Sequence, residues 1–149
     1  MQAVMSPKEM TDYLIEVFPQ VKGDYTIEKM DGQNTVVRLR IAEQHLRPGG
    51  TVSGPAMFAL ADVTAYIATM ACVGREALSV TTNCSIDFMR KPIAGVDLIA
   101  EARMLKLGKT LAVTDILIFS KGSKAPVARA NMTYAIPPRG QSKLQYISA

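Results

Sequence analysis

The feature that most constrains this chain is one long apolar run, from Ala56 to Val73, that contains a single charged residue, Asp62. The run is 18 residues long, is rich in Ala and Met, and ends at Gly74, which favours a helix over a strand. A helix that is apolar on nearly every side has to be enclosed. We therefore expect a curved antiparallel β-sheet to wrap around it.

A membrane-spanning role for this run is the main structural alternative, because about 20 apolar residues cross a bilayer. The run is slightly shorter than that, contains Asp62, Thr64 and Thr69, and precedes amphipathic strands that need a core of their own. These features favour the core helix of a globular protein, with no membrane as a partner.

The rest of the chain carries signals for one more helix and six strands. Ser6, Pro7 and Glu9 form a capping-box pattern, which predicts a short helix ending near Phe18. The predicted strands are Tyr25 to Met30, Thr35 to Ile41, Ala77 to Arg90, Val96 to Leu107, Thr110 to Ser120 and Val127 to Ile136. The breaks between the last four strands are short and contain turn-forming residues, so we expect each of these strands to pair antiparallel with the next.

Length and composition favour a single domain. The chain has 149 residues, of which 48% are hydrophobic, and this is ample material for one core. We predict one α+β domain over residues 1–136, followed by a polar, Pro-containing tail over residues 137–149.

Residues 1–10 lack the apolar segment of a secretion signal, and Cys72 and Cys84 form no CxxC pattern. These features predict a cytoplasmic protein with reduced thiols.

Several function classes are disfavoured. The net charge is +4, but the basic residues are scattered, and 6% aromatic residues with no Trp is little for stacking on bases. The chain has no GxSxG, no HExxH and no dinucleotide-binding fingerprint, and Gly108-Lys109-Thr110 lacks the rest of a phosphate-binding P-loop. We expect no nucleic-acid partner, no metal and no cofactor.

Asp62 is the first candidate for chemistry, because an ionised carboxylate in an apolar helix costs several kcal/mol unless something compensates it. It either receives hydrogen bonds that fix the packing, or it acts as a general base or nucleophile in a mostly dry cleft.

At the entrance to the helix, Gly54 offers a backbone N–H to an anion or a carbonyl oxygen, whereas Pro55 has none. The alternative role of Gly54 is only to allow the turn, with Ser53 capping the helix.

The combined pattern resembles the hotdog-fold acyl-CoA thioesterases, and within them the phenylacetate-degradation (PaaI-type) branch. The resemblance covers residues 25 to 136. It rests on the Gly54 loop, on Asp62 eight residues later, on Thr81 in a strand, on the segment from Ile86 to Pro92 and on the Gly108-Lys109 turn. It implies a hotdog fold and hydrolysis of an acyl-CoA to a carboxylic acid and CoA. It also implies that Asp62 is the catalytic aspartate, acting as general base or nucleophile, that Gly54 forms the oxyanion hole, and that Thr81 places the attacking water.

The helix entrance departs from the family pattern. Members usually have His-Gly-Gly there, where this chain has Ser53-Gly54-Pro55. Many members also have an Asn in the preceding loop, at a spacing that falls on Arg47 here. The only histidine of the chain, His45, takes that polar role or is a simple loop residue.

The remaining candidates concern substrate binding. Arg90 and Lys91 at a strand end, and Lys106 and Lys109 around a turn, either meet the phosphates of CoA or are ordinary solvated ends of strands. Ser53 and Pro55 at the helix entrance, with Met57 and Phe58 in its first turns, are the other expected substrate-binding residues.

Helix geometry also predicts an oligomer. Gly54 and Asp62 are eight residues apart, which is about 12 Å along a helix that rises 1.5 Å per residue. One thioester carbonyl does not easily touch both from the same helix, so we expect the site to lie across a two-fold interface. The family resemblance also implies paired hotdog subunits, assembled as a homodimer or homotetramer. The alternative function is a non-catalytic acyl-CoA-binding hotdog protein. A hotdog hydratase is disfavoured, because the apolar run contains no His.

Overall fold

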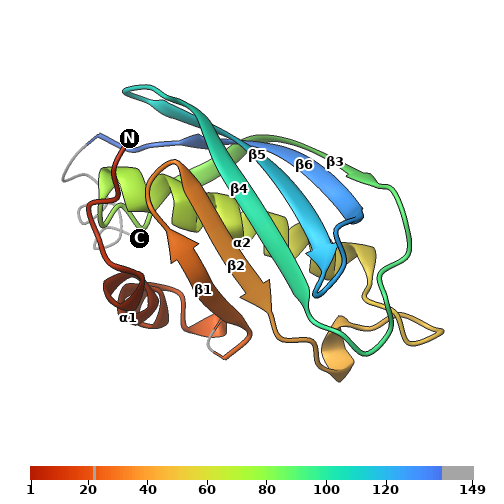
Figure 1. The fold of residues 1–149 in the computed structure, drawn as a ribbon. Helices are drawn as coiled ribbons and strands as arrows, with labels where there is room; N and C mark the ends of the chain where they lie inside the picture. The colour runs from red at the N-terminus through yellow and green to blue at the C-terminus, as the bar shows by residue number, and fades with distance from the viewer. Residues whose placement is uncertain (22, 139–149) are drawn as a thin grey trace.

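The computed structural model describes residues 1–21 and 23–138. It has the predicted α+β hotdog architecture, in which a six-stranded antiparallel sheet wraps around one long helix and a short N-terminal helix lies beside the first strand (Figure 1). Residues 139–149 of the predicted tail lie outside the described residues.

The short helix α1 spans Pro7–Val17 and begins with the predicted capping box. The Ser6 hydroxyl accepts a hydrogen bond from the Glu9 N–H at 3.1 Å, and the Ser6 N–H donates to Glu9 Oε1 at 3.0 Å. Met10 and Leu14 bury the inner face of the helix. Two 3₁₀ turns follow in the chain, at Pro19–Val21 and Glu43–His45.

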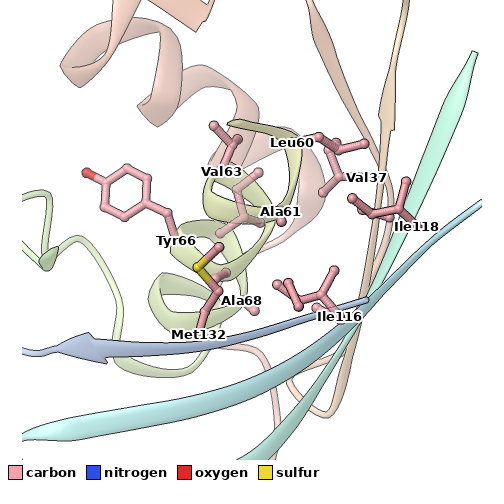
Figure 2. Packing of buried hydrophobic residues seen from close by; sticks show 14 of the residues in the cluster. Val37, Leu60, Ala61, Val63, Tyr66, Ala68, Ile116, Ile118 and Met132 are labelled. Atoms are coloured by element: carbon pink, nitrogen blue, oxygen red, sulfur yellow. The ribbon is translucent and has the colours of Figure 1, made fainter. Parts of the chain in front are cut away.

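The long helix α2 spans Gly54–Val73, starting two residues before the predicted boundary. It starts earlier because Ser53 is the N-cap: its hydroxyl accepts from the Ala56 N–H at 3.3 Å, and Pro55 fits the first turn. Twelve of the twenty residues of α2 are buried. Figure 2 shows Val37 and Ile118 of the sheet packed on one side of α2, while Tyr66 points away from them.

Helix α2 is long and apolar enough to cross a membrane by length and composition alone, and 67% of its apolar window is buried inside the fold. Its apolar character is therefore accounted for by the core that it forms with the concave face of the sheet.

The strands are close to those predicted, and no strand end differs from its predicted position by more than three residues. Their bounds are β1 Tyr25–Met30, β2 Asn34–Leu39, β3 Val80–Phe88, β4 Leu98–Leu107, β5 Leu111–Ser120 and β6 Pro126–Ala135. The order across the sheet is β1-β2-β4-β5-β6-β3.

The expectation that each late strand pairs with the next is wrong for β3. This strand pairs with β6, and β4 instead lies between β2 and β5. The connection from Met89 to Asp97 is nine residues long, which is enough for the chain to cross the end of the sheet instead of turning back on itself. As a result β3 is an edge strand, and it runs alongside β6 near Asp62.

Candidate active site

Three elements meet at Asp62. Its half-buried side chain comes from α2, and its Oδ1 accepts a hydrogen bond from the Thr81 hydroxyl on β3 at 2.5 Å. The same Oδ1 accepts a second hydrogen bond from the Tyr134 hydroxyl on β6 at 2.8 Å. The structure thus brings together two of the predicted catalytic residues, Asp62 and Thr81, and adds Tyr134 to them.

The two hydroxyls share a face because Thr81 and Tyr134 are directly opposite each other in the β3–β6 ladder. The ladder shifts register just after this pair, between Thr81 and Asn83. Such bulges bend a strand and change the direction of its side chains. The register of the sheet therefore fixes both donors against one carboxylate oxygen.

The other carboxylate oxygen is differently placed. Within residues 1–21 and 23–138, no Lys, Arg or His forms an ion pair with Asp62, and no group donates a hydrogen bond to its Oδ2. Two hydroxyl donors thus hold Oδ1, while Oδ2 is free to take a proton or to attack a carbonyl carbon.

Tyr134 is the functional candidate that sequence reasoning missed. Its side chain is only 4% exposed, and its ring stacks on Tyr66 with centroids 5.9 Å apart. Burial, reinforced by the nearby Asp62 charge, raises the pKa of Tyr134 well above its usual range, so the hydroxyl stays protonated and donates. Its contact with Asp62 joins residues 72 positions apart, and no local pattern in the sequence signals such a pair.

Tyr66 anchors this aromatic pair. Its hydroxyl donates to the Ala77 carbonyl at 2.5 Å, and Phe18 packs edge-on against its ring at 6.3 Å. Burial raises the pKa of Tyr66 to about 12, so this hydroxyl also remains a donor near neutral pH. The Tyr134 ring is therefore held on a rigid support.

Gly54 is the first residue of α2, as expected for a donor at a helix N-terminus. The next residue, Pro55, has no N–H, and the N–H groups of Ala56 and Met57 donate to the Ser53 hydroxyl and carbonyl. Among the described residues, no group accepts from the Gly54 N–H. The first turn therefore presents one unpaired backbone donor, beside the Phe88 ring, which lies 3.5 Å from where a Cβ of residue 54 would be.

His45 lies in the loop before the helix and is 8% exposed. Its Nδ1 accepts from the Ala42 N–H at 2.8 Å, and its Nε2 lies 3.5 Å from Asp24 Oδ2. Its carbonyl accepts from the Ser53 N–H at 2.8 Å, which ties this loop to the helix cap. No hydrogen bond or ion pair among the described residues joins His45 to Asp62.

The predicted substrate-binding residues are spread over a wider area. Met57 is buried in the core at 5% exposure, Phe58 is half-buried, and Pro55 is exposed in the first turn. Arg90 donates through Nε to the Pro126 carbonyl at 2.9 Å, and Lys91 and Lys109 are exposed. Arg90 and Lys91 follow Phe88, whose ring lies beside Gly54. Lys109 lies in the turn between β4 and β5, and no hydrogen bond or ion pair among the described residues joins it to Asp62, Thr81 or Tyr134.

No group of three or more His, Cys, Asp or Glu residues in the described part of the chain is arranged to hold a metal ion. The chemistry available here is that of a carboxylate with one oxygen held by two hydroxyls, together with an unpaired N–H at the start of the same helix.

Sequence comparison identifies the family. The Thioesterase superfamily profile matches residues 49–134. Acyl-coenzyme A thioesterase 13 of Homo sapiens is 30% identical over 118 residues, which cover 78% of this chain and 82% of that protein. Acyl-coenzyme A thioesterase PaaI of Escherichia coli (strain K12) is 35% identical over 98 residues, 66% of this chain and 68% of that protein.

A solved structure supports the same family assignment. A candidate thioesterase from Silicibacter sp. TM1040 superposes with a TM-score of 0.87 at 58% identity, covering 93% of this chain and 96% of that one. The segment that matches the family profile contains Gly54, Asp62, Thr81 and Tyr134. The chain belongs to the hotdog-fold thioesterase superfamily, in its PaaI-type branch.

Proposed function

We propose that this protein hydrolyses an acyl-CoA thioester to a carboxylic acid and CoA, with Asp62 as the group that activates water. The observation that carries the proposal is the carboxylate of Asp62, which has Thr81 and Tyr134 on Oδ1 and a free Oδ2. Its placement in the family-matched segment and the activity named for the relatives support the same reaction.

In the proposed reaction, the Gly54 N–H donates a hydrogen bond to the thioester carbonyl oxygen and stabilises the negative charge that develops there. Oδ2 of Asp62 takes a proton from water as the water oxygen bonds to the carbonyl carbon. The tetrahedral intermediate then collapses, the C–S bond breaks, and the proton passes from Asp62 to the departing CoA thiolate.

Thr81 has a second role in this scheme. Its hydroxyl proton points to Asp62, and its oxygen can still accept a hydrogen bond from the attacking water. An alternative for the same carboxylate is direct attack on the thioester, which forms an anhydride that water then cleaves. Incorporation of ¹⁸O from labelled water into Asp62 in a single turnover would identify the anhydride route.

We further propose that Gly54 and Asp62 act from different subunits. They lie about 12 Å apart along one helix, too far to serve one carbonyl together. Strand β3 supports an interface, because it is a nine-residue edge strand with a single charged residue, Asp87, and an exposed apolar residue at each end. A long edge of this kind favours pairing with another chain. Pairing of two β3 edges would bring the helix entrance of one copy toward the carboxylate of the other, in a homodimer or in the dimers of a homotetramer.

CoA would lie along the rim next to Gly54. Arg90 and Lys91 follow β3 and are exposed there, so they are the cations best placed to meet its phosphates. Lys109 is a weaker candidate, because it lies in the β4–β5 turn with no contact that connects it to the site.

The test is a thiol-release assay with short, medium and aromatic acyl-CoAs. We expect release of CoA from at least one of them, with saturation kinetics. Saturable binding of acyl-CoA without release of thiol would contradict hydrolysis and favour the alternative, a non-catalytic acyl-CoA-binding protein.

A further inference from the structure

The Tyr134 hydroxyl makes more contacts than its burial requires. A buried tyrosine hydroxyl needs one hydrogen-bond partner. The Tyr134 hydroxyl lies 2.8 Å from Asp62 Oδ1 and 3.1 Å from the Asp62 carbonyl oxygen, so it reaches both the side chain and the backbone of one residue. It therefore positions the carboxylate relative to its own helix.

The two donors on Oδ1 differ in rigidity. Thr81 is a half-buried residue on an edge strand that is mostly exposed, and its hydroxyl can rotate, whereas the Tyr134 hydroxyl is fixed by a ring that stacks on Tyr66. A carboxylate oxygen accepts two hydrogen bonds readily, so the pair occupies Oδ1 and directs Oδ2 outward. Without Tyr134, the carboxylate can rotate about its Cβ–Cγ bond and exchange its two oxygens.

We propose that Tyr134 is a positioning residue that acts through Asp62: it holds Oδ1 so that Oδ2 faces the reacting water. This inference rests on the proposed function of Asp62 and adds to it a residue that the family resemblance did not supply. Tyr134 does not touch the substrate in this scheme, because its hydroxyl is already engaged by Asp62 and its ring is buried.

The test compares Tyr134→Phe with a matched control, Tyr66→Phe. Both substitutions remove one hydroxyl from the same stacked pair and keep the ring, but only Tyr134 contacts Asp62. We expect Tyr134→Phe to lower kcat by roughly 10- to 100-fold, the effect of losing a hydrogen bond to a charged group, with little change in KM. We expect Tyr66→Phe to change kcat by less than about threefold, since its hydroxyl bonds only the Ala77 carbonyl.

Two readouts separate positioning from packing. In Tyr134→Phe the loss should fall on kcat and leave KM within about twofold, because the carboxylate is released while the substrate contacts remain. In an Asp62→Asn background, Tyr134→Phe should lower the residual kcat by no more than about twofold, as expected when one residue acts through another. A loss of kcat in Tyr66→Phe as large as in Tyr134→Phe, or an undiminished effect in the Asp62→Asn background, would overturn the proposal.

A measurement that needs no activity keeps this inference separate from the proposed function. Crystal structures of the two variants compare the orientation of the Asp62 carboxylate. We expect the carboxylate to rotate about its Cβ–Cγ bond in Tyr134→Phe and to keep its orientation in Tyr66→Phe. An unchanged orientation in Tyr134→Phe would contradict the proposed role of Tyr134 even if the wild-type protein hydrolyses acyl-CoA. A rotated carboxylate in a protein that hydrolyses no acyl-CoA would support the contact and reject the catalytic role.

Discussion

At the scale of single residues, Asp62 shows how an apolar helix accommodates a carboxylate. Leaving such a group unpaired in a low-dielectric site costs several kcal/mol. Each hydrogen bond to a charged group stabilises by about 1.5–3 kcal/mol, so the donors from Thr81 and Tyr134 offset much of that cost without any cation. Among the described residues, no Lys, Arg or His forms an ion pair with Asp62, so the two hydroxyls are the groups that compensate its charge.

Gly54 allows a prediction at the same scale. Gly54→Ala should leave the fold intact, because its Cβ would meet the Phe88 ring at 3.5 Å, an ordinary van der Waals contact. The added methyl lies where the thioester must approach the backbone N–H. We expect kcat/KM to fall at least about tenfold, part of the 10²–10³ that loss of an oxyanion-hole donor costs. Thermal unfolding and thiol release measure the two effects.

A change in the melting temperature of more than a few degrees in Gly54→Ala would contradict the tolerance expected from this contact. Unchanged kcat/KM in a stable Gly54→Ala variant would contradict the role of Gly54 as the oxyanion-hole donor.

At the scale of elements, Asp97 connects two strands that are far apart in the sequence. It lies just before β4, and its Oδ2 accepts a hydrogen bond from Nε of Arg38 on β2 at 2.7 Å. Nη2 of the same guanidinium forms an ion pair with this oxygen at 2.6 Å. Its Oδ1 accepts from the Ile41 N–H at 3.1 Å. Partial burial acts to raise the pKa of Asp97, but the Ile41 N–H and the Arg38 guanidinium outweigh it and hold the pKa below its usual value.

The lowered pKa of Asp97 predicts a pH dependence of stability. The unfolded chain binds this proton at a higher pH than the folded one does, so the contribution is fully present above the unfolded pKa of about 4 and is lost as pH falls through the folded value. Asp97→Asn should lower the free energy of unfolding by about 1–3 kcal/mol near pH 7. Urea unfolding at pH 7 and at pH 3 checks this: the difference between the two proteins should shrink at pH 3. An equal difference at both pH values would show that the charge of Asp97 is not responsible.

The β3 edge carries the second prediction at this scale. Cys84 is the middle residue of β3 and is exposed. If two β3 strands pair around a two-fold axis, Cys84 lies nearest its own copy. Cys84→Lys therefore places like charges together, and we expect dissociation to monomers with loss of thiol release. The matched control is Leu111→Lys, at a 46% exposed position on β5.

Light scattering after size-exclusion chromatography measures the mass of both variants. A fully active monomeric Cys84→Lys variant would contradict a site shared between subunits, and an unchanged oligomer would remove β3 from the interface.

At the scale of the whole molecule, the sequence predicts the elements better than their arrangement. The capping box of Ser6 and Glu9 and the glycine that closes α2 are local signals, and each marks an element boundary in the structure. The place of β3 is not local. β3 pairs with β6 because β4 lies between β2 and β5. This strand order depends on contacts between residues that are far apart in the sequence.

In the candidate site, too, some residues are signalled by the local sequence and others only by the arrangement of the strands. Asp62 stands out because it is a lone charge in an apolar run, and Gly54 because it lies in the loop that leads into that run. Tyr134 gives no such signal, since one tyrosine in an amphipathic strand is ordinary, and only the register of β3 on β6 places it opposite Thr81. The loop role of His45, with its ring bonded to Ala42 three residues away, also depends on the turn geometry.

The most direct test of the proposed function is the Asp62→Asn variant, assayed for thiol release on the best acyl-CoA found for the wild-type protein. The amide keeps the size of the side chain and can still accept from Thr81 and Tyr134, so the fold and the binding of acyl-CoA should persist. We expect kcat to fall by roughly 10²–10⁴-fold, the usual cost of losing a general base. Nearly full turnover in a folded Asp62→Asn protein would contradict the catalytic role of Asp62, and with it the proposed mechanism.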